Sequence, residues 1–425
     1  MNTKFKFLLI FICSFNLKAY APTNFHRPYD TNFRMNAWRG RGINEAKFRI
    51  GGNFEYGNTT KARNWNSGKV DLLAMYQSSQ SSISMLLGAE PGSSIDNLSK
   101  EISPATDDGV RGHFKLSGSK YEELAYTLYA QRYFNFESIP GRVLFTSYFP
   151  FRDMKISNVT WEDQTLGVNN DDLLVQSKIT NDIFGIASSL GGLDLYNWHE
   201  SGISDVVLMF AWENNFKQES KRNLENVKLT GKLGVTLPTG KKKDENKALS
   251  LPLGNDGAVG LPCSAQLDLY FKNNITLGIE LEFLKLFDET RLRRLKSDTH
   301  QTEFLLLSKG RARKEFSPTW KFNLYLQAEH FYRGLSAMVA FQNSKHGNDK
   351  LFSKSNSFDN GIINSSQSLY DWSYHNLIFQ VNYDFFKNLK KSTFKPQMSF
   401  FYKIGLAGRR TIQANTVGWQ VAFNF

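Results

Sequence analysis

The stretch that decides the fold is Val417-Gly-Trp-Gln-Val-Ala-Phe-Asn-Phe425, at the end of the chain. Its apolar side chains occupy every second position, and its last residue is aromatic. Successive side chains of a β-strand point to opposite faces, so a strand here has one wholly apolar face. The stretch predicts a strand that separates an apolar environment from a polar one.

The same alternation recurs along most of the chain. In Ile275–Phe283, for example, large apolar residues alternate with Thr276, Gly278, Glu280 and Glu282. A strand that crosses a bilayer needs about 9–11 residues, apolar toward lipid and polar toward the lumen. Sixteen stretches fit this pattern: 45–56, 69–77, 110–118, 122–134, 141–149, 155–162, 203–213, 225–237, 262–272, 274–286, 303–311, 318–331, 335–344, 374–385, 394–406 and 415–425.

These stretches predict an all-β protein, a transmembrane antiparallel β-barrel. Single-chain bacterial barrels take even strand numbers, and we expect about 14 strands, with 12 and 16 as alternatives. One detail conflicts with the sixteen candidates. Tight turns at Lys272-Asn273-Asn274 and Arg333-Gly334 are separated by three candidate strands, which would put them on opposite sides of the membrane. Either one of them is an outer turn, or one strand is miscounted.

The N-terminus predicts export. Lys4 and Lys6 precede the short apolar run Phe7–Cys13, and Ala19-Tyr20-Ala21 has the small-x-small pattern of a signal-peptidase site. We therefore divide the chain into a signal peptide (1–21), an N-terminal periplasmic segment (22–44) and the barrel (45–425). The predicted location is the bacterial outer membrane. Cys263 is then the remaining cysteine, so we expect neither an internal disulfide nor a cysteine-rich metal site.

Composition narrows the class further. The chain is 41% hydrophobic and 14% aromatic, too aromatic for a disordered protein and too polar for a bundle of membrane helices. The net charge of +12 is spread along strands and loops rather than gathered in one block, so we predict no nucleic-acid partner. The partners we expect are outer-membrane lipid and lipopolysaccharide, together with a small-molecule solute.

Long excursions separate some of the candidate strands. The segment 163–202 includes a predicted helix near 171–190, which an Asp-Asp pair opens and Gly191-Gly192 closes. This helix, or the Ser-, Gly- and Pro-rich loop 78–109, could plug the lumen. The basic run Arg291 to Lys296 is either a solvated loop or a clamp for phosphate or another anion.

Charged residues on the polar faces are the candidate lumen lining. They are Lys47, Arg49, Arg111, His113, Lys115, Lys228, Lys232, Glu280, Glu282 and Lys321. With a few further strand residues, this set has a small excess of positive charge, which predicts a slight preference for anions. The seven histidines form neither a His-x-x-x-His pair nor part of another hydrolase motif, so we predict no enzyme activity, no catalytic residue, no metal and no cofactor.

Two stretches resemble known outer-membrane proteins. The last strand, with Trp419, Val421, Phe423 and Phe425 on one face, is similar to the terminal strand by which the barrel insertion machinery recognises its clients. Residues 232–240, Lys-Leu-Gly-Val-Thr-Leu-Pro-Thr-Gly, followed by a polar loop and Gly257-Ala-Val-Gly260, resemble the MetA-pathway phenol-degradation family of barrels and, more loosely, fatty-acid and aromatic-compound channels. The resemblance implies passage of small molecules and gives no functional residue.

Two functions fit these observations. The first is a pore or channel for passive passage of small solutes, apolar or aromatic ones among them. The second is a structural or adhesion barrel whose surface loops bind a partner. A channel needs a continuous polar path, whereas a structural barrel can be plugged, so the state of the lumen distinguishes them.

Overall fold

The computed structural model describes residues 47–138, 140–219, 223–385 and 395–425. The predicted signal peptide and periplasmic segment lie outside this part of the chain. Within the described residues, no helix is both long enough and apolar enough to cross a membrane.

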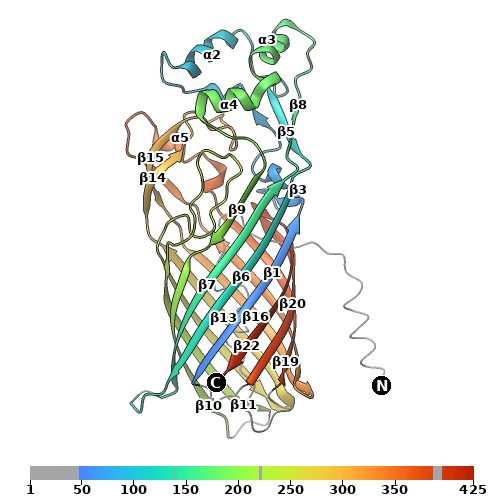
Figure 1. The fold of residues 1–425 in the computed structure, drawn as a ribbon, viewed down its shortest axis with the longest axis vertical. Helices are drawn as coiled ribbons and strands as arrows, with labels where there is room; N and C mark the ends of the chain where they lie inside the picture. Colours follow the sequence, from blue (N-terminus) through green and yellow to red (C-terminus); the bar gives the residue numbers. More distant parts are fainter. Residues whose placement is uncertain (1–46, 139, 220–222, 386–394) are drawn as a thin grey trace, which may run out of the picture.

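Twelve antiparallel strands of the described chain close into a barrel (Figure 1). Their order around the wall follows the sequence, because each strand pairs with the next one along the chain. Pairing of β1 with β22 and of β7 with β10 completes the ring. The strands are β1 (Phe48–Thr59), β6 (Lys120–Phe134), β7 (Arg142–Ser157), β10 (Val206–Lys217), β11 (Leu224–Leu237), β12 (Gly260–Phe271), β13 (Ile275–Leu286), β16 (Thr319–Tyr332), β17 (Leu335–His346), β19 (Trp372–Asp384), β20 (Lys395–Arg409) and β22 (Asn415–Asn424).

The barrel confirms the predicted fold class and lies at the lower end of the expected strand range. Four of the sixteen candidate strands are not separate barrel strands: 69–77, 110–118 and 303–311 lie in the outer connections, and 155–162 covers the end of β7 and a short strand beyond it. Removing 303–311 resolves the conflict between the two tight turns. Only β13 and β16 then separate Lys272–Asn274 from Arg333-Gly334, so both turns lie at the same end of the barrel.

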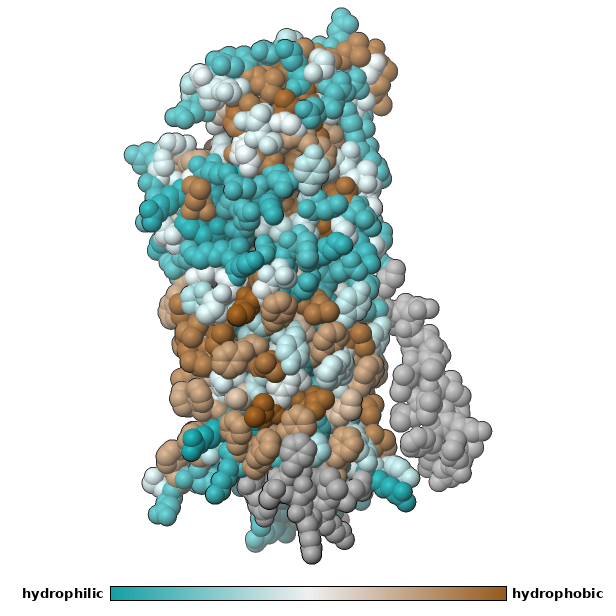
Figure 2. Space-filling view, in the orientation of Figure 1, coloured by the Kyte–Doolittle hydropathy of each residue, from teal (hydrophilic) through white to brown (hydrophobic). Residues whose placement is uncertain are grey.

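The two faces of the strands follow the predicted alternation. In β13, Thr276, Glu280 and Glu282 are buried, whereas Ile279 and Leu281 are exposed on the outer face. On the face shown in Figure 2, outward side chains form an apolar belt across the lower half of the molecule, and a polar band lies directly above it. This belt is the surface that faces lipid in a membrane barrel.

At the other end, six connections, five of them long, fold together into a cap (Figure 1). They follow β1, β7, β11, β13, β17 and β20. The cap contains three small sheets: β2 (Lys61–Arg63) with β3 (Lys69–Asp71) and β21 (Thr411–Ile412); β4 (Gln80–Ser81) with β5 (His113–Ser117) and β8 (Thr160–Asp163); and β14 (Glu289–Arg294) with β15 (Lys309–Glu315) and β18 (Lys350–Ser353). Its helices are α2 (Ser94–Ile102), α3 (Asn170–Lys178), α4 (Ile183–Gly191) and α5 (Asn360–Ile363), with short 3-10 turns at Leu72–Met75, Ser84–Leu86, Thr180–Asp182 and Gln367–Leu369.

The helix predicted near 171–190 is present as two helices, α3 and α4. Asn169 caps the first by accepting a hydrogen bond from the backbone N–H of Asp172, and Gly192 ends the second in the left-handed conformation. Ile183 and Ala187 of α4 are buried in an apolar cluster of the cap with Phe114 and Leu307. The helix therefore belongs to the core of the cap.

One connection crosses the barrel mouth. Residues 238–259 enter from β11, and Leu249 and Leu253 pack against Tyr121, Met154 and Trp198 of the barrel wall. The wall is interrupted at this point, because the strand β9 (Trp198–Ile203) and β10 are separated by the buried pair Ser204-Asp205. Asp205 accepts hydrogen bonds from the backbone N–H groups of Gly240 (2.9 Å) and Asn255 (2.5 Å). The Leu-Pro-Thr-Gly stretch thus ends a wall strand and fixes the connection to the wall.

Candidate functional site

The barrel interior is polar and densely packed. Asp268 and Asn323 are fully buried, and Glu280 is 1% exposed. The hydroxyl of Tyr325 donates a hydrogen bond to Asp268 and accepts one of 2.8 Å from Gln266. A lumen wide enough for water along these strands would leave such side chains exposed. The inward residues therefore fill the space between the walls with a hydrogen-bonded network.

Most of the charges in this network form ion pairs. Lys232 lies 2.7 Å from Glu280, and Lys228 lies 2.9 Å from Glu213. The other pairs are Lys321 with Glu282 (3.3 Å), Lys403 with Glu55 (2.9 Å), Arg142 with Glu213 (2.8 Å) and Arg152 with Glu123. Burying a charge without a partner is costly, and these cross-strand pairs offset that cost.

The charge balance of the interior differs from the sequence prediction. Among the described barrel strands, the buried Lys, Arg, Asp and Glu residues are four cations and seven carboxylates: Arg49, Arg152, Lys228 and Lys321, against Glu55, Glu213, Asp268, Glu280, Glu282, Glu329 and Asp384. Adding the partly buried members of the ion pairs, the cations Lys232, Lys403 and Arg142 and the carboxylate Glu123, gives seven cations and eight carboxylates. The predicted anion preference therefore loses its basis.

Glycines on the inner wall make room for aromatic rings. Gly278 is paired with Tyr325 on the next strand, and the ring occupies the space where a Cβ of residue 278 would lie. Gly51 with Tyr129, and Gly418 with Phe401, repeat this arrangement. A ring that lies flat over a glycine stays close to the wall. The polar side chains can then meet in the middle.

The structure divides the ten predicted lumen residues into two groups. Arg49, Lys228, Lys232, Glu280, Glu282 and Lys321 lie on the buried faces of barrel strands. Arg49 reaches across the wall to Gln397, to which its guanidinium donates a hydrogen bond of 3.2 Å. Tyr325, Asp268, Glu213 and Arg152 belong to the same network, although they were not singled out from the sequence. Arg152 was missed because Pro150 interrupted the pattern of β7.

The other four predicted residues do not line the barrel, and the prediction for them is corrected. Lys47 is exposed just before β1. Arg111, His113 and Lys115 lie in the cap, where β5 alternates as regularly as a wall strand but belongs to the sheet β4–β5–β8. Arg111 forms a 2.7 Å ion pair with Asp172 at the start of α3, and His113 hydrogen-bonds Ser79 and Asp107. These residues connect segments of the cap.

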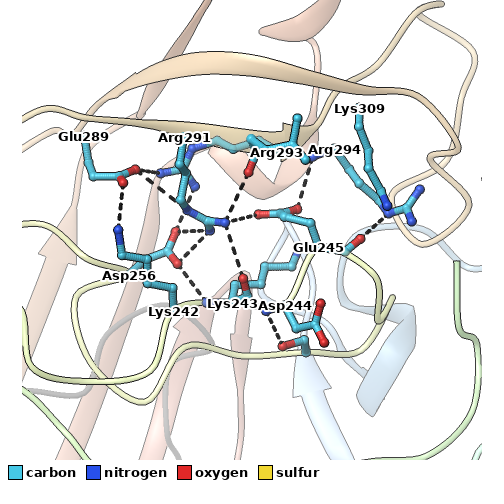
Figure 3. Close-up of polar contacts among 12 residues, drawn as sticks. Lys242, Lys243, Asp244, Glu245, Asp256, Glu289, Arg291, Arg293, Arg294 and Lys309 are labelled. Atoms are coloured by element: carbon cyan, nitrogen blue, oxygen red, sulfur yellow. Dashed lines mark hydrogen bonds and ion pairs between the residues drawn. The ribbon is translucent and has the colours of Figure 1, made fainter. Parts of the chain in front are cut away.

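The basic run after β13 is neither a solvated loop nor an open anion clamp. Arg291 and Arg293 turn into the cap and both bind Asp256 of the 238–259 connection, at 2.7 and 2.8 Å (Figure 3). Glu245, from the same connection, lies 2.8 Å from Arg291, and Glu289 lies 2.9 Å from Arg293. We call Glu245, Asp256, Glu289, Arg291 and Arg293 the cap latch. It holds the connection across the barrel mouth against the β14–β15 hairpin.

Electrostatics strengthens the cap latch. Burial alone would raise the pKa of Asp256, but the positive charges of Arg293 and Arg291 outweigh it, and the pKa lies well below its usual range. Asp349, in the same part of the cap, behaves alike because Lys314 and His346 lie 2.8 Å away. Both carboxylates therefore stay ionised at neutral pH.

The sequence matches no protein-family model and no curated protein, but the fold has solved counterparts. An outer-membrane channel from Pseudomonas putida F1 superposes with a TM-score of 0.50 at 12% identity, over 89% of this chain and 96% of that one. The toluene transporter TodX from Pseudomonas putida covers 96% of both chains at 9% identity, with a TM-score of 0.35. The first likeness confirms, at the level of the fold, the expected resemblance to channel-forming outer-membrane barrels.

Proposed function

We propose that this protein is an outer-membrane channel for passive passage of small solutes, apolar or aromatic ones among them. The observation that carries the proposal is the interior of the barrel, where polar and charged residues recur on the inward faces of the strands. A purely structural wall has no evident use for so many buried charges, each of which costs free energy to desolvate. Export by the 1–21 signal peptide, insertion through the terminal strand and a surrounding layer of lipopolysaccharide are parts of the same proposal.

The packed interior specifies the kind of channel. Because the network fills the described lumen, a solute passes only where side chains move aside, and wide-pore conductance is not expected. The same packing supports a second candidate, a structural or adhesion barrel that presents its cap to a partner. The two candidates differ in whether the network opens.

Single-channel recording in planar bilayers tests the proposal. Wild-type protein should give small, brief ohmic steps. Tyr325→Ala removes the ring that lies over Gly278 and hydrogen-bonds Asp268, so it should give larger and longer steps. Tyr332→Ala, on the same strand but at an exposed position, is the matched control and should conduct as wild type does.

Ion selectivity can be measured in the same recordings. The nearly balanced interior predicts a reversal potential close to zero in a salt gradient. Replacing Lys228 and Lys232 by Glu removes one cationic partner each from Glu213 and Glu280 and should shift the reversal potential toward cation selectivity. If folded wild type and folded Tyr325→Ala both fail to give any step, an ion-conducting pore is excluded, and either a structural barrel or a narrow channel for apolar solutes is favoured.

A further inference from the structure

The cap encloses a cavity to which all six connections contribute. Its volume is about 130 Å³. One lining residue from each connection illustrates the convergence: Leu72, Leu193, Leu249, Leu306, Ile363 and Ile412. A space built from six separate segments exists only when the whole cap is folded, and the cap latch holds one of its walls, the 238–259 connection, in place.

The size and lining of this cavity fit one kind of occupant. Leu, Ile, Met and Ala side chains make up just over half of its lining, Phe304 and Tyr76 are aromatic contacts, and the remaining lining residues are Lys, Arg, Glu and Ser. A dry cavity of roughly 150 Å³ lined by Leu, Ile and Phe is large enough to bind benzene. The cap cavity therefore has room for a single aromatic ring with at most a small substituent, and a fused two-ring molecule does not fit.

Four cations line the cavity: Lys296 is buried, and Lys243, Lys247 and Arg294 are half-buried. Arg294 and Lys296 differ in what they already bind. The guanidinium of Arg294 donates to the carbonyls of Glu245, Leu306 and Leu307, and to those of Gly191 and Gly192, which uses all five of its N–H groups. Burial lowers its pKa to about 10, so it remains charged. Arg294 thus fastens the wall and has no donor left for a ligand.

Lys296 is in the opposite situation. It is 3% exposed, and its ammonium makes one hydrogen bond of 3.4 Å to the carbonyl of Thr299 and one long ion pair of 3.7 Å with Glu303. Glu303 accepts shorter hydrogen bonds from the hydroxyl of Ser366 (2.6 Å) and the backbone N–H of Gln367 (2.7 Å). An ammonium has three donors, so at least one of them lacks a partner among the described residues. A ligand oxygen in the cavity would supply that partner.

We propose that the cap cavity binds a single-ring aromatic molecule that carries one hydrogen-bond-accepting oxygen, with the ring among the aliphatic residues and the oxygen on Lys296. This inference deepens the proposed function, since it names the solute class that the cap would admit. The binding site itself does not depend on conductance.

Fluorine NMR with the folded protein in detergent micelles tests the proposal, with 4-fluorophenol, fluorobenzene and 4-fluoro-1-naphthol as probes. The first two should bind wild type and the naphthol should not. Lys296→Met keeps the length of the side chain but removes its donors, so the affinity for 4-fluorophenol should fall about tenfold or more, whereas that for fluorobenzene should change little. Lys296→Gln, which keeps a donor, should restore part of the loss.

Two further variants serve as controls for the location of the binding site. Ala248→Phe fills the cavity from its wall and should abolish binding of both single-ring probes. Lys178→Met, at an exposed site on α3, removes a lysine elsewhere in the cap and should leave both affinities unchanged. Binding that survives Ala248→Phe, or a loss with Lys296→Met that is equal for both probes, would overturn the proposal. Binding without conductance would retain this site and reject an ion-conducting pore, and conductance without binding would do the reverse.

Discussion

Inward side chains are of opposite character in the barrel and in the cap. On β13 the inward residues include Thr276, Glu280 and Glu282, whereas the cap buries Leu249, Leu253 and Ile183. The reason is the solvent outside each region. Lipid surrounds the barrel, so apolar side chains are stable on its outer face, and polar ones gather inside where they can hydrogen-bond one another. Water surrounds the cap, and apolar side chains are stable only in its interior.

Strand β7 shows where the lipid-facing part of the wall ends and the water-facing part begins. Along β7, outward residues change from Phe149 and Phe151 to Asp153 and Lys155, while inward residues change from Arg152 to Met154 and Ile156. On the neighbouring strand β6, the outward Leu124 and Glu122 pair with Asp153 and Lys155, so the change on β6 is offset by one outward residue pair from the change on β7. We infer that the membrane boundary lies at this level.

The largest expected effect comes from a deletion that disrupts the barrel and leaves the cap sequence intact. Deleting Phe423–Phe425 removes the last pairs of the β1–β22 seam, including the hydrogen bond from the N–H of Phe425 to the carbonyl of Phe48 (2.9 Å). We expect membrane assembly to be lost, as measured by heat-modifiable mobility on a gel. Deleting the exposed cap residues Ser355–Ser357 is the matched control and should not prevent assembly. A normally assembled Phe423–Phe425 deletion would contradict the role of the terminal strand.

The next prediction compares the two outer surfaces with one substitution. Ile279→Arg puts a charge on the lipid face and should cost about 2–4 kcal/mol of folding free energy if the site lies near the bilayer midplane. Leu173→Arg, on an exposed face of α3, should change stability by less than about 0.5 kcal/mol. Urea titration in lipid vesicles gives both values. A substitution of Gly278, on the inner face of the same strand, would not serve as a control, because the ring of Tyr325 occupies the space where its side chain would lie. Equal effects at the two sites would show that the outer faces do not differ.

The smallest effect concerns the cap alone. The pKa values of Asp256 and Asp349 are lowered in the folded cap by the cations beside them, so their contribution to stability is complete above the ordinary value of 3.8 and is lost as pH falls below it. Proteolysis of the 238–259 connection, with an acid-active protease, should be flat from pH 7 to about 5 and rise below about 4. Asp256→Asn should weaken this pH dependence, and the barrel should stay intact throughout. A rise beginning near neutral pH would contradict the assignment.

Much of the barrel could be predicted from the sequence alone. The period-two alternation in Val417–Phe425, Ile275–Phe283 and their counterparts located all twelve wall strands, because a strand with different environments on its two faces must alternate. The helical stop and start signals around Asp171 and Gly191 likewise predicted the helical excursion. The polar network was predicted in part, since Lys232, Glu280 and Lys321 stand on the faces that the alternation assigns to the interior.

What the tertiary structure decided is which side of each alternating strand faces water. His113–Ser117 alternates like a wall strand, yet Phe114 and Leu116 point into a cap core and His113 and Lys115 point away from it. Alternation shows that a strand has one apolar face, but it does not show what that face contacts. The pattern is the same whether the apolar face meets lipid outside a barrel or other side chains inside a cap. Two features depend on contacts between residues far apart in the chain. One is the pairing of Arg291 and Arg293 with Asp256, and the other is the filling of the lumen by side chains from strands all around the barrel. No local pattern encodes those contacts, so only the assembled fold could reveal the cap latch, the cap cavity and the filled interior.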